Sequence, residues 1–260
     1  MTIEALAGEW IVPQWDVPCS VRAFVTTRFH PQVRGTEFDT GPADPDTLDP
    51  DRRAVVVANR AFLASRLPSA PVWLEQTHGR DVACIDEKTI DAARLVPPVA
   101  DAAVTRLVDV PLAIRVADCL PVFLGDNDGS VVAAAHAGWR GLAAGVLEAT
   151  VDAMGVPPST LRAWLGPTIG AQAFEVGGDV VDAFLHYDRD ARSCFTPGRE
   201  GKWMADLQAL ARRRLAACGV DRVHGADACT WSDASRFFSW RRDRTPQRMA
   251  ALLWRASPQA

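Results

Sequence analysis

Short apolar runs dominate the middle of the chain and predict β-strands. Val21–Thr27 (VRAFVTT) is apolar and β-branched, which is typical of a strand. From Val72 to Ala137 the runs VWLEQ, DVACI, DAAVT, PLAIRVAD, PVFLG and VVAAAHA follow one another, separated by turn signals such as HG, PP and DNDG. Leu161–Leu165 and a segment that begins at Asp221–His224 add two further strands. The pattern therefore predicts a strand-rich core.

Other segments have the spacing of amphipathic helices, in which apolar residues recur every three or four positions. Proline or glycine marks their ends. These segments are Arg53–Leu67, followed by Pro68; residues 139–155, closed by Gly155; Asp179–Tyr187; and Met204–Cys218, stopped by Gly219.

The remaining segments predict loops and the overall class. Residues 30–53, rich in Pro, Gly and Asp, predict a long surface loop. Gly166–Gly178 (GPTIGAQAFEVGG) predicts a second loop, which is either a lid or a plain connection. SRFFSWRRD and RMAALLW close the chain. Because strands cluster without strict βαβ alternation, we expect an α+β fold. It would be one layered domain over residues 1–260, with its core at about 21–254 and a mixed β-sheet flanked by helices.

Composition and charge exclude several classes of partner. The chain has 28 basic and 32 acidic residues, a net charge of −4, and so lacks the basic character of a nucleic-acid-binding protein. Its apolar stretches fall far short of the ~18 residues of a membrane span. The N-terminal MTIEALAGEWIVPQW has no signal-peptide pattern, so we expect a cytoplasmic protein. There the six cysteines, none in a CxxC motif, predict thiols or metal ligands instead of disulfides.

Three polar residues stand at the ends of predicted strands. His78 follows VWLEQ, Cys119 follows LAIRVA and Asp118, and His136 ends VVAAAHA. Each has a plain structural alternative, because many histidines only satisfy local hydrogen bonds and many cysteines are simply buried.

The segment after His136 has a further signal. Gly138 and Gly141 lead into a predicted helix, whose first N–H groups can bind an anion. Arg140 adds a guanidinium suited to phosphate or carboxylate. The alternative is a tight strand-to-helix connection in which the glycines serve packing.

Together, His78, Cys119 and His136 match the ligands of a catalytic zinc site, which has three protein ligands and one open position. They lie 41 and 17 residues apart (119 − 78 and 136 − 119), so only the fold could assemble them. A metal-free Cys–His nucleophile dyad would use the same residues. Asp118 could orient an imidazole or cap a turn.

Aromatic residues and arginines suggest where a substrate binds. Phe237–Asp243 (FFSWRRD) places aromatics beside arginine, which suits a planar heterocycle but equally suits core packing. The candidate substrate-binding residues are Arg28, Gln76, Arg140, Phe174 and Arg241.

These motifs together resemble one family, long labelled laccase-domain or multicopper polyphenol oxidase. It is now described as zinc-dependent purine nucleoside phosphorylases, and some bacterial members are called peptidoglycan editing factors. The similarity runs from about Val21 to Trp254, and ADCLP and HAGWRG are its most specific parts. The matching pieces are TTR (26–28), NRAFL (59–63), QTHGRDV (76–82), ADAAVT (100–105), ADCLPV (117–122), AHAGWRG (135–141), GPTIG with FEVG (166–177), ADL (205–207), CT (229–230), FFSWRRD (237–243) and RMAA (248–251).

The resemblance implies that His78, Cys119 and His136 bind one zinc ion and form the catalytic site. Asp118, next to Cys119, is a further candidate catalytic residue. It implies an enzyme that phosphorolyses adenosine, inosine, guanosine and methylthioadenosine and also deaminates adenosine. Purine nucleosides and phosphate would be its partners, and it would be a monomer or weak oligomer. It also implies an α/β/α-type layered fold, similar to Cys–His deamidase toxins.

The chain departs from the family pattern at a few places. FHPQVRGTEFDTGPADPDTLDPD stands where the family has a glycine-rich loop after TTR, which bears on base or sugar preference. Trp240 stands where Tyr is common, and Arg244 where Gly is common.

The older copper label conflicts with the residue counts. A blue copper site alone takes two histidines and a cysteine, and a trinuclear cluster takes many more histidines. Five histidines cannot supply both, so we do not expect copper. Two other hypotheses remain: a metal-free Cys–His hydrolase or amidase that acts on a cell-wall precursor, and a non-catalytic binding protein.

Overall fold

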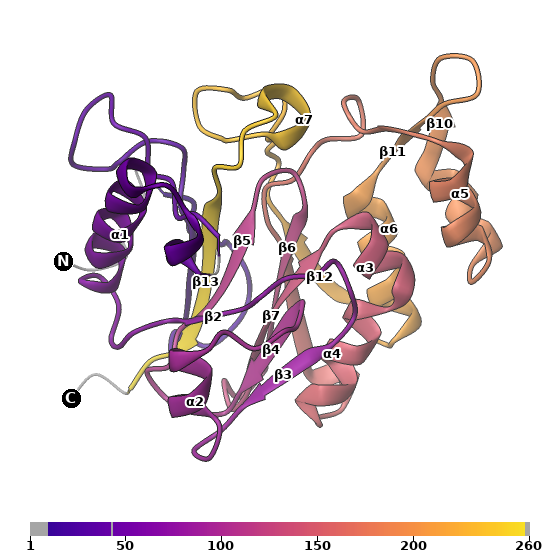
Figure 1. Cartoon of the computed structure of the whole chain (residues 1–260). Helices are drawn as coiled ribbons and strands as arrows, with labels where there is room; N and C mark the ends of the chain where they lie inside the picture. Colours follow the sequence, from indigo (N-terminus) through magenta and orange to yellow (C-terminus); the bar gives the residue numbers. More distant parts are fainter. Residues whose placement is uncertain (1–9, 43, 258–260) are drawn as a thin grey trace.

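The computed structural model describes residues 10–42 and 44–257, and its centre is a pair of β-sheets (Figure 1). The larger sheet has the strand order β12-β8-β6-β7-β4-β3. Its strands are β3 (Val82–Ile85), β4 (Ala102–Thr105), β6 (Leu120–Asp126), β7 (Val132–Ala137), β8 (Leu161–Leu165) and β12 (Arg222–Gly225).

The smaller central sheet has the order β1-β13-β5-β2, and a third sheet, β10-β11-β9, lies apart from the pair. Both central sheets are mixed, because β12–β8, β3–β4 and β2–β5 pair in parallel and the other pairs are antiparallel. The strands are β1 (Val21–Val25), β2 (Val72–Trp73), β5 (Leu112–Val116), β13 (Met249–Arg255), β9 (Glu175–Val176), β10 (Phe195–Pro197) and β11 (Trp203–Ala205).

Helices cover both outer faces of the sheet pair. None of the described helices is long and apolar enough to cross a membrane. They are α1 (Pro50–Ala64), α2 (Ile90–Leu95), α3 (Trp139–Ala144), α4 (Val146–Met154), α5 (Gly178–Leu185), α6 (Leu207–Ala217) and α7 (Trp240–Asp243), with short 3-10 helices η2 (Pro45–Thr47), η3 (Pro158–Thr160) and η4 (Arg189–Cys194).

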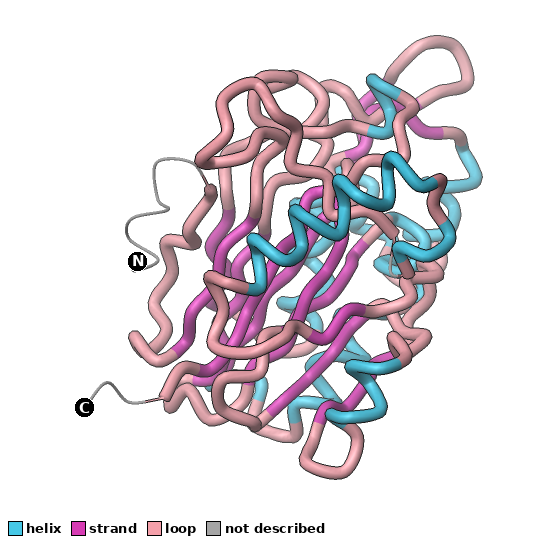
Figure 2. Tube along the Cα trace, turned by 60° about the vertical axis from the view of Figure 1, so that its left-hand side comes forward, coloured by secondary structure: helices cyan, strands magenta, loops and turns pink. Residues whose placement is uncertain are grey.

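Three buried clusters define the layers. The sheets pack face to face through residues such as Ile114 of the smaller sheet and Phe123 of the larger. The outer face of the larger sheet packs against α4 and α6, and that of the smaller sheet against α1, which places helices on either side (Figures 1 and 2). The predicted α+β class is therefore confirmed, and its mixed β core consists of two stacked sheets.

This burial explains the apolar runs of the sequence. Every residue of β6 and of β7 is buried, because each strand faces the other sheet on one side and helices on the other. Strands covered on both faces lose the alternation of apolar and polar residues. The alanines of β7 allow close packing on both sides at the centre of the sheet.

Two predicted helix boundaries were wrong because of local backbone effects. Residues 139–155 form two helices, since Gly145 adopts the left-handed conformation (φ 96°) between α3 and α4. The helix predicted from Met204 begins at Leu207, where the Asp206 carboxylate accepts a hydrogen bond from the Ala209 N–H (2.9 Å). Met204 instead lies in β11, a hairpin strand that the sequence pattern did not reveal.

Other expectations hold with changed limits. The loop predicted over 30–53 ends earlier, because α1 begins at Pro50 with Asp49 as its cap. RMAALLW forms β13, a strand inside the smaller sheet. All six cysteines are free thiols, as predicted. Residues 1–9, which carry most of the segment judged not to be a signal peptide, lie outside the described residues.

The interface between the two sheets should carry much of the stability. Phe123 is fully buried and stacks on Trp164 with ring centroids 5.5 Å apart. We expect Phe123→Ala to lower the free energy of unfolding in urea by about 3–5 kcal/mol, through lost burial and an inter-sheet cavity. Val57→Ala, at an exposed position of α1, should change it by less than about 0.5 kcal/mol. Equal effects of the two substitutions would contradict this packing.

Candidate functional site

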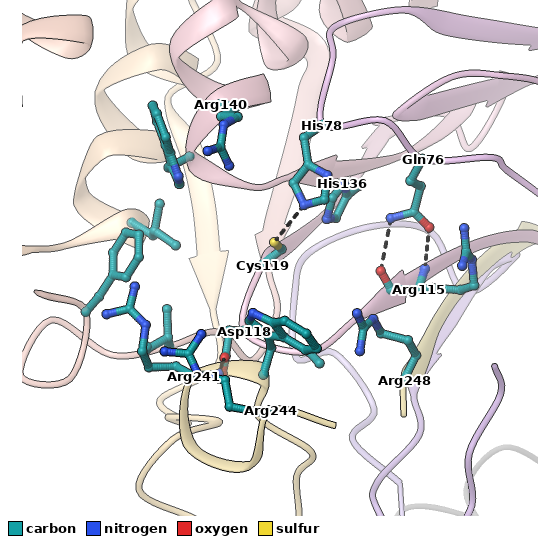
Figure 3. A pocket seen from close by; sticks show the side chains of 16 residues that line it. Gln76, His78, Arg115, Asp118, Cys119, His136, Arg140, Arg241, Arg244 and Arg248 are labelled. Atoms are coloured by element: carbon teal, nitrogen blue, oxygen red, sulfur yellow. Dashed lines mark hydrogen bonds between the residues drawn. The ribbon is translucent and has the colours of Figure 1, made fainter. Parts of the chain in front are cut away.

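A cavity of about 490 Å³ opens where the strand ends predicted to carry chemistry meet (Figure 3). His78 follows β2, Cys119 lies between β5 and β6, and His136 is the fifth residue of β7. All three line the cavity, and their candidate ligand atoms lie within 4.8 Å of one another. Two stacked sheets thus bring together residues far apart in sequence.

Asp101, directly before β4, holds the histidine side of the site. Its carboxylate is fully buried and accepts hydrogen bonds from the N–H groups of Thr77 (3.1 Å), His78 (3.0 Å) and Gly79 (2.6 Å). It also accepts a bond from Nδ1 of His136 (2.8 Å). One carboxylate therefore fixes the turn that carries one histidine and the ring orientation of the other.

The orientation of His136 follows from this bond. Because Nδ1 donates to Asp101, Nε2 is the nitrogen left for the cavity. The His78 ring stands nearly perpendicular to the His136 ring, with centroids 4.8 Å apart and an interplanar angle of 79°. His78 itself has a left-handed backbone (φ 61°), a conformation held by the N–H bonds of its turn to Asp101.

Cys119 faces both histidines. Its Sγ lies 3.8 Å from Nε2 of His78. Burial opposes ionisation of the thiol, but the positive charge of His136 and hydrogen bonds from both histidines outweigh it and lower the pKa of Cys119 to about 6. Burial likewise opposes the charged His136, yet the Cys119 thiolate and Asp101 raise the pKa of its imidazole to about 9.

Two glycines let the backbone pass close to this cluster. A Cβ at position 138 would lie 3.0 Å from both Cys119 Sγ and His78 Cδ2, closer than side chains normally pack. At position 141 a Cβ would lie 2.6 Å from the carbonyl oxygen of Gly79. The glycines that begin α3 therefore let the helix approach the two ligand-bearing turns.

Asp118 orients neither histidine, and its carboxylate instead caps the turn at the start of α7, the second of its two predicted roles. Its carboxylate accepts bonds from Thr230 Oγ1 (2.6 Å), Ser239 Oγ (3.0 Å) and the Arg241 N–H (2.7 Å). It touches neither histidine, and Asp101 is the carboxylate that orients an imidazole. Asp118 instead joins the Cys119 turn to the start of α7, which carries Trp240 and Arg241 into the cavity wall.

The candidate substrate residues fall into two groups. Gln76, Arg140, Phe174 and Arg241 line the cavity. The Arg241 guanidinium lies 5.3 Å from the Phe174 ring centroid and donates to the carbonyl of Glu175 (2.8 Å). Arg28 is not among the lining residues, since it pairs with Glu37 (2.8 Å) on the loop after β1.

Sequence reasoning missed several residues of the site. Asp101 is part of the ADAAVT motif, but a carboxylate before an apolar strand gives no direct signal that it meets His136. Arg115 stands inside the apolar strand LAIRV, and a charge within such a strand was a usable signal. Arg248, before β13, also lines the cavity.

Comparison with known proteins places the chain in a family. A family model described as multi-copper polyphenol oxidoreductase laccase matches residues 23–256. A Pseudomonas aeruginosa protein named purine nucleoside phosphorylase is 48% identical over 246 residues, covering 94% of this chain and 98% of the relative. The purine nucleoside phosphorylase YfiH of Escherichia coli is 43% identical over 249 residues, with the same two coverages.

Solved structures agree with the sequence comparison. The crystal structure of protein NMB0706 from Neisseria meningitidis superposes with a TM-score of 0.85 and 40% identity, covering 96% of this chain and all of that one. YlmD from Geobacillus stearothermophilus gives a TM-score of 0.77 at 27% identity, covering 92% and 93% of the two chains. The chain therefore belongs to the family whose model is described as multi-copper polyphenol oxidoreductase laccase.

Proposed function

We propose that this protein is a zinc-dependent purine nucleoside phosphorylase that acts on adenosine, inosine, guanosine and methylthioadenosine, with adenosine deamination as a second activity. The observation that carries the proposal is the cluster of His78, Cys119 and His136 in a cavity lined by arginines and aromatic rings. The names of the relatives support the reaction class.

The donor set fits zinc. For zinc–sulfur and zinc–nitrogen bonds of about 2.3 and 2.1 Å, tetrahedral geometry separates the two ligand atoms by about 3.6 Å. The Cys119 Sγ and His78 Nε2 atoms lie 3.8 Å apart. The lowered pKa of Cys119 supplies the thiolate that a metal needs. His78, Cys119 and His136 would hold the ion, and five histidines remain too few for a multicopper oxidase.

In phosphorolysis a phosphate oxygen bonds to the anomeric carbon of the sugar while the bond to the purine nitrogen breaks, and the purine takes up the electron pair and a proton. A zinc ion in this cluster would supply Lewis acidity. Phe174 and Arg241 line the same part of the cavity, where the ring would contact a planar purine and the guanidinium would stabilise negative charge on the departing base. Asp101 keeps the His136 ring in place throughout.

The charged pair of Cys119 and His136 also favours a second candidate function. A thiolate beside an imidazolium is the arrangement of Cys–His hydrolases, which need no metal. The cell-wall hydrolase or amidase hypothesis therefore stays open beside the phosphorylase. A non-catalytic binding protein has no such observation in its favour.

Metal analysis separates these hypotheses. We expect the purified protein to hold about one zinc per chain, and His78→Ala to lose it, because two remaining protein ligands bind zinc weakly. His186→Ala is the matched control, since His186 is an exposed histidine at the end of α5. Metal content by plasma mass spectrometry is the measurement. A metal-free protein inactivated by thiol alkylation would instead support the hydrolase.

The carboxylate that orients His136 should tune the metal site. We expect Asp101→Asn to weaken zinc affinity by about 10- to 100-fold, as loss of such partners typically does. A chelator competition titration gives the affinity, and circular dichroism of the same sample shows whether the variant is folded. A folded Asp101→Asn protein with unchanged zinc affinity would show that the Asp101–His136 bond does not act on the metal.

The reaction itself is tested by chromatography of nucleosides incubated with and without phosphate. We expect free purine to form only when phosphate is present, and adenosine to give a separate inosine product without it. Cys119→Ala, which removes a metal ligand, should abolish both activities. If the zinc-loaded protein turns over none of the four nucleosides, the proposed function is wrong.

A further inference from the structure

The cavity has more positive charge than its own carboxylate can balance. Its lining has one carboxylate, Asp118, whose two oxygens are occupied by Thr230, Ser239 and the Arg241 N–H. The surplus cations favour a negatively charged ligand. The lining arginines are Arg115, Arg140, Arg241, Arg244 and Arg248.

These arginines differ in what they can do. Arg140 and Arg244 are exposed at the cavity mouth, and Arg140 lies against the Trp139 ring (4.5 Å). Arg241 already donates to the Glu175 carbonyl beside Phe174. Arg115 and Arg248 are the partly buried pair on the other wall, next to Gln76 (Figure 3).

The fold holds Arg115 and Arg248 close to each other. Arg115 lies in β5 and Arg248 directly precedes β13, and these strands pair with Met249 opposite Val116 and Ala250 opposite Arg115. The side-chain amide of Gln76 makes two hydrogen bonds to the backbone of Arg115. Its Nε2 donates to the Arg115 carbonyl (3.0 Å), and its Oε1 accepts from the Arg115 N–H (2.8 Å). Burial lowers the pKa of Arg115 to about 10, the negative charges of Glu75 and Asp101 oppose this effect, and the positive charge of Arg248 adds to it.

Donor groups of this pair remain unused. Arg115 Nη2 donates to the Leu74 carbonyl (3.0 Å), but its Nε is buried and has no hydrogen-bond partner. The guanidinium of Arg248 donates through Nη1 to the carbonyls of Thr245 (3.2 Å) and Gln247 (2.8 Å), and among the described residues its Nε and Nη2 have no hydrogen-bond acceptor. Within the part of the chain that the structure describes, neither guanidinium has a carboxylate within 4.0 Å.

We propose that Arg115 and Arg248 form a subsite for inorganic phosphate, on the wall of the cavity opposite Phe174 and Arg241. A tetrahedral dianion would balance two like charges that burial otherwise penalises. Arginine binds phosphate oxygens through paired N–H donors, and the unused groups of Arg248 provide them. This inference rests on the proposed function. Phosphate and purine would bind at separate walls of the cavity, with the metal ligands between them.

Direct binding of inorganic phosphate tests the subsite without requiring turnover. We expect calorimetric titration to show phosphate binding to the wild type and at least about tenfold weaker binding to Arg248→Met, the effect of losing charge-assisted bonds. Arg244→Met is the matched control, because it removes an exposed arginine of the same cavity and should change the dissociation constant by less than about threefold. If both variants lose phosphate affinity equally, the binding depends only on the overall positive charge of the cavity, and the proposed subsite is wrong.

The kinetic constants give an independent check. We expect Arg248→Met to raise KM for phosphate about tenfold or more while KM for the nucleoside changes little, and Arg241→Met to do the reverse. If Arg248→Met does not fold, Arg248→Lys decides, since it keeps the charge and removes the paired donors. Arg248-dependent phosphate binding without nucleoside cleavage would refute the proposed function but keep the subsite. Phosphorolysis with an unchanged phosphate KM in these variants would refute the subsite alone.

Discussion

The site depends above all on one buried carboxylate, that of Asp101. A buried charge is costly unless several donors satisfy it. Here the donors are the N–H groups of residues 77–79 and the ring of His136. The stabilisation of this one group thus fixes the backbone of the first candidate ligand and the ring of the second. It also joins the end of the smaller sheet to the start of β4 in the larger one.

The stacked sheets give the cavity two walls of different character. On one wall lie Arg115 of β5, whose backbone is bonded to Gln76, and Arg248, which directly precedes β13. On the other, the loop before β9 and helix α7 present Phe174 and Arg241, and Asp118 anchors that helix to the turn of Cys119. The candidate metal ligands lie between the walls. Under the proposed function, phosphate would bind at the first wall and the purine at the second.

The sequence pattern predicted the fold well where local effects decide it. Apolar runs predicted the strands of both central sheets except β13, and Gly155 and Gly219 marked the ends of α4 and α6, whereas α2 and α7 were not predicted. The sequence pattern could not predict the pairing of β13 with β1 and β5, because both partner strands are remote from β13 in the sequence. Strand ends pointed to His78, Cys119 and His136. The roles of Asp101 and Asp118 could not be assigned, because which carboxylate meets which ring depends on the distance between strands that are remote in sequence.

In the proposed site, His78, Cys119 and His136 together hold one zinc ion. X-ray absorption at the zinc edge of the purified protein measures the ligand shell directly. We expect one sulfur at about 2.3 Å and two imidazole nitrogens at about 2.0–2.1 Å, with one oxygen or nitrogen atom completing the shell. A shell of nitrogen and oxygen alone, without sulfur, would contradict the proposed site.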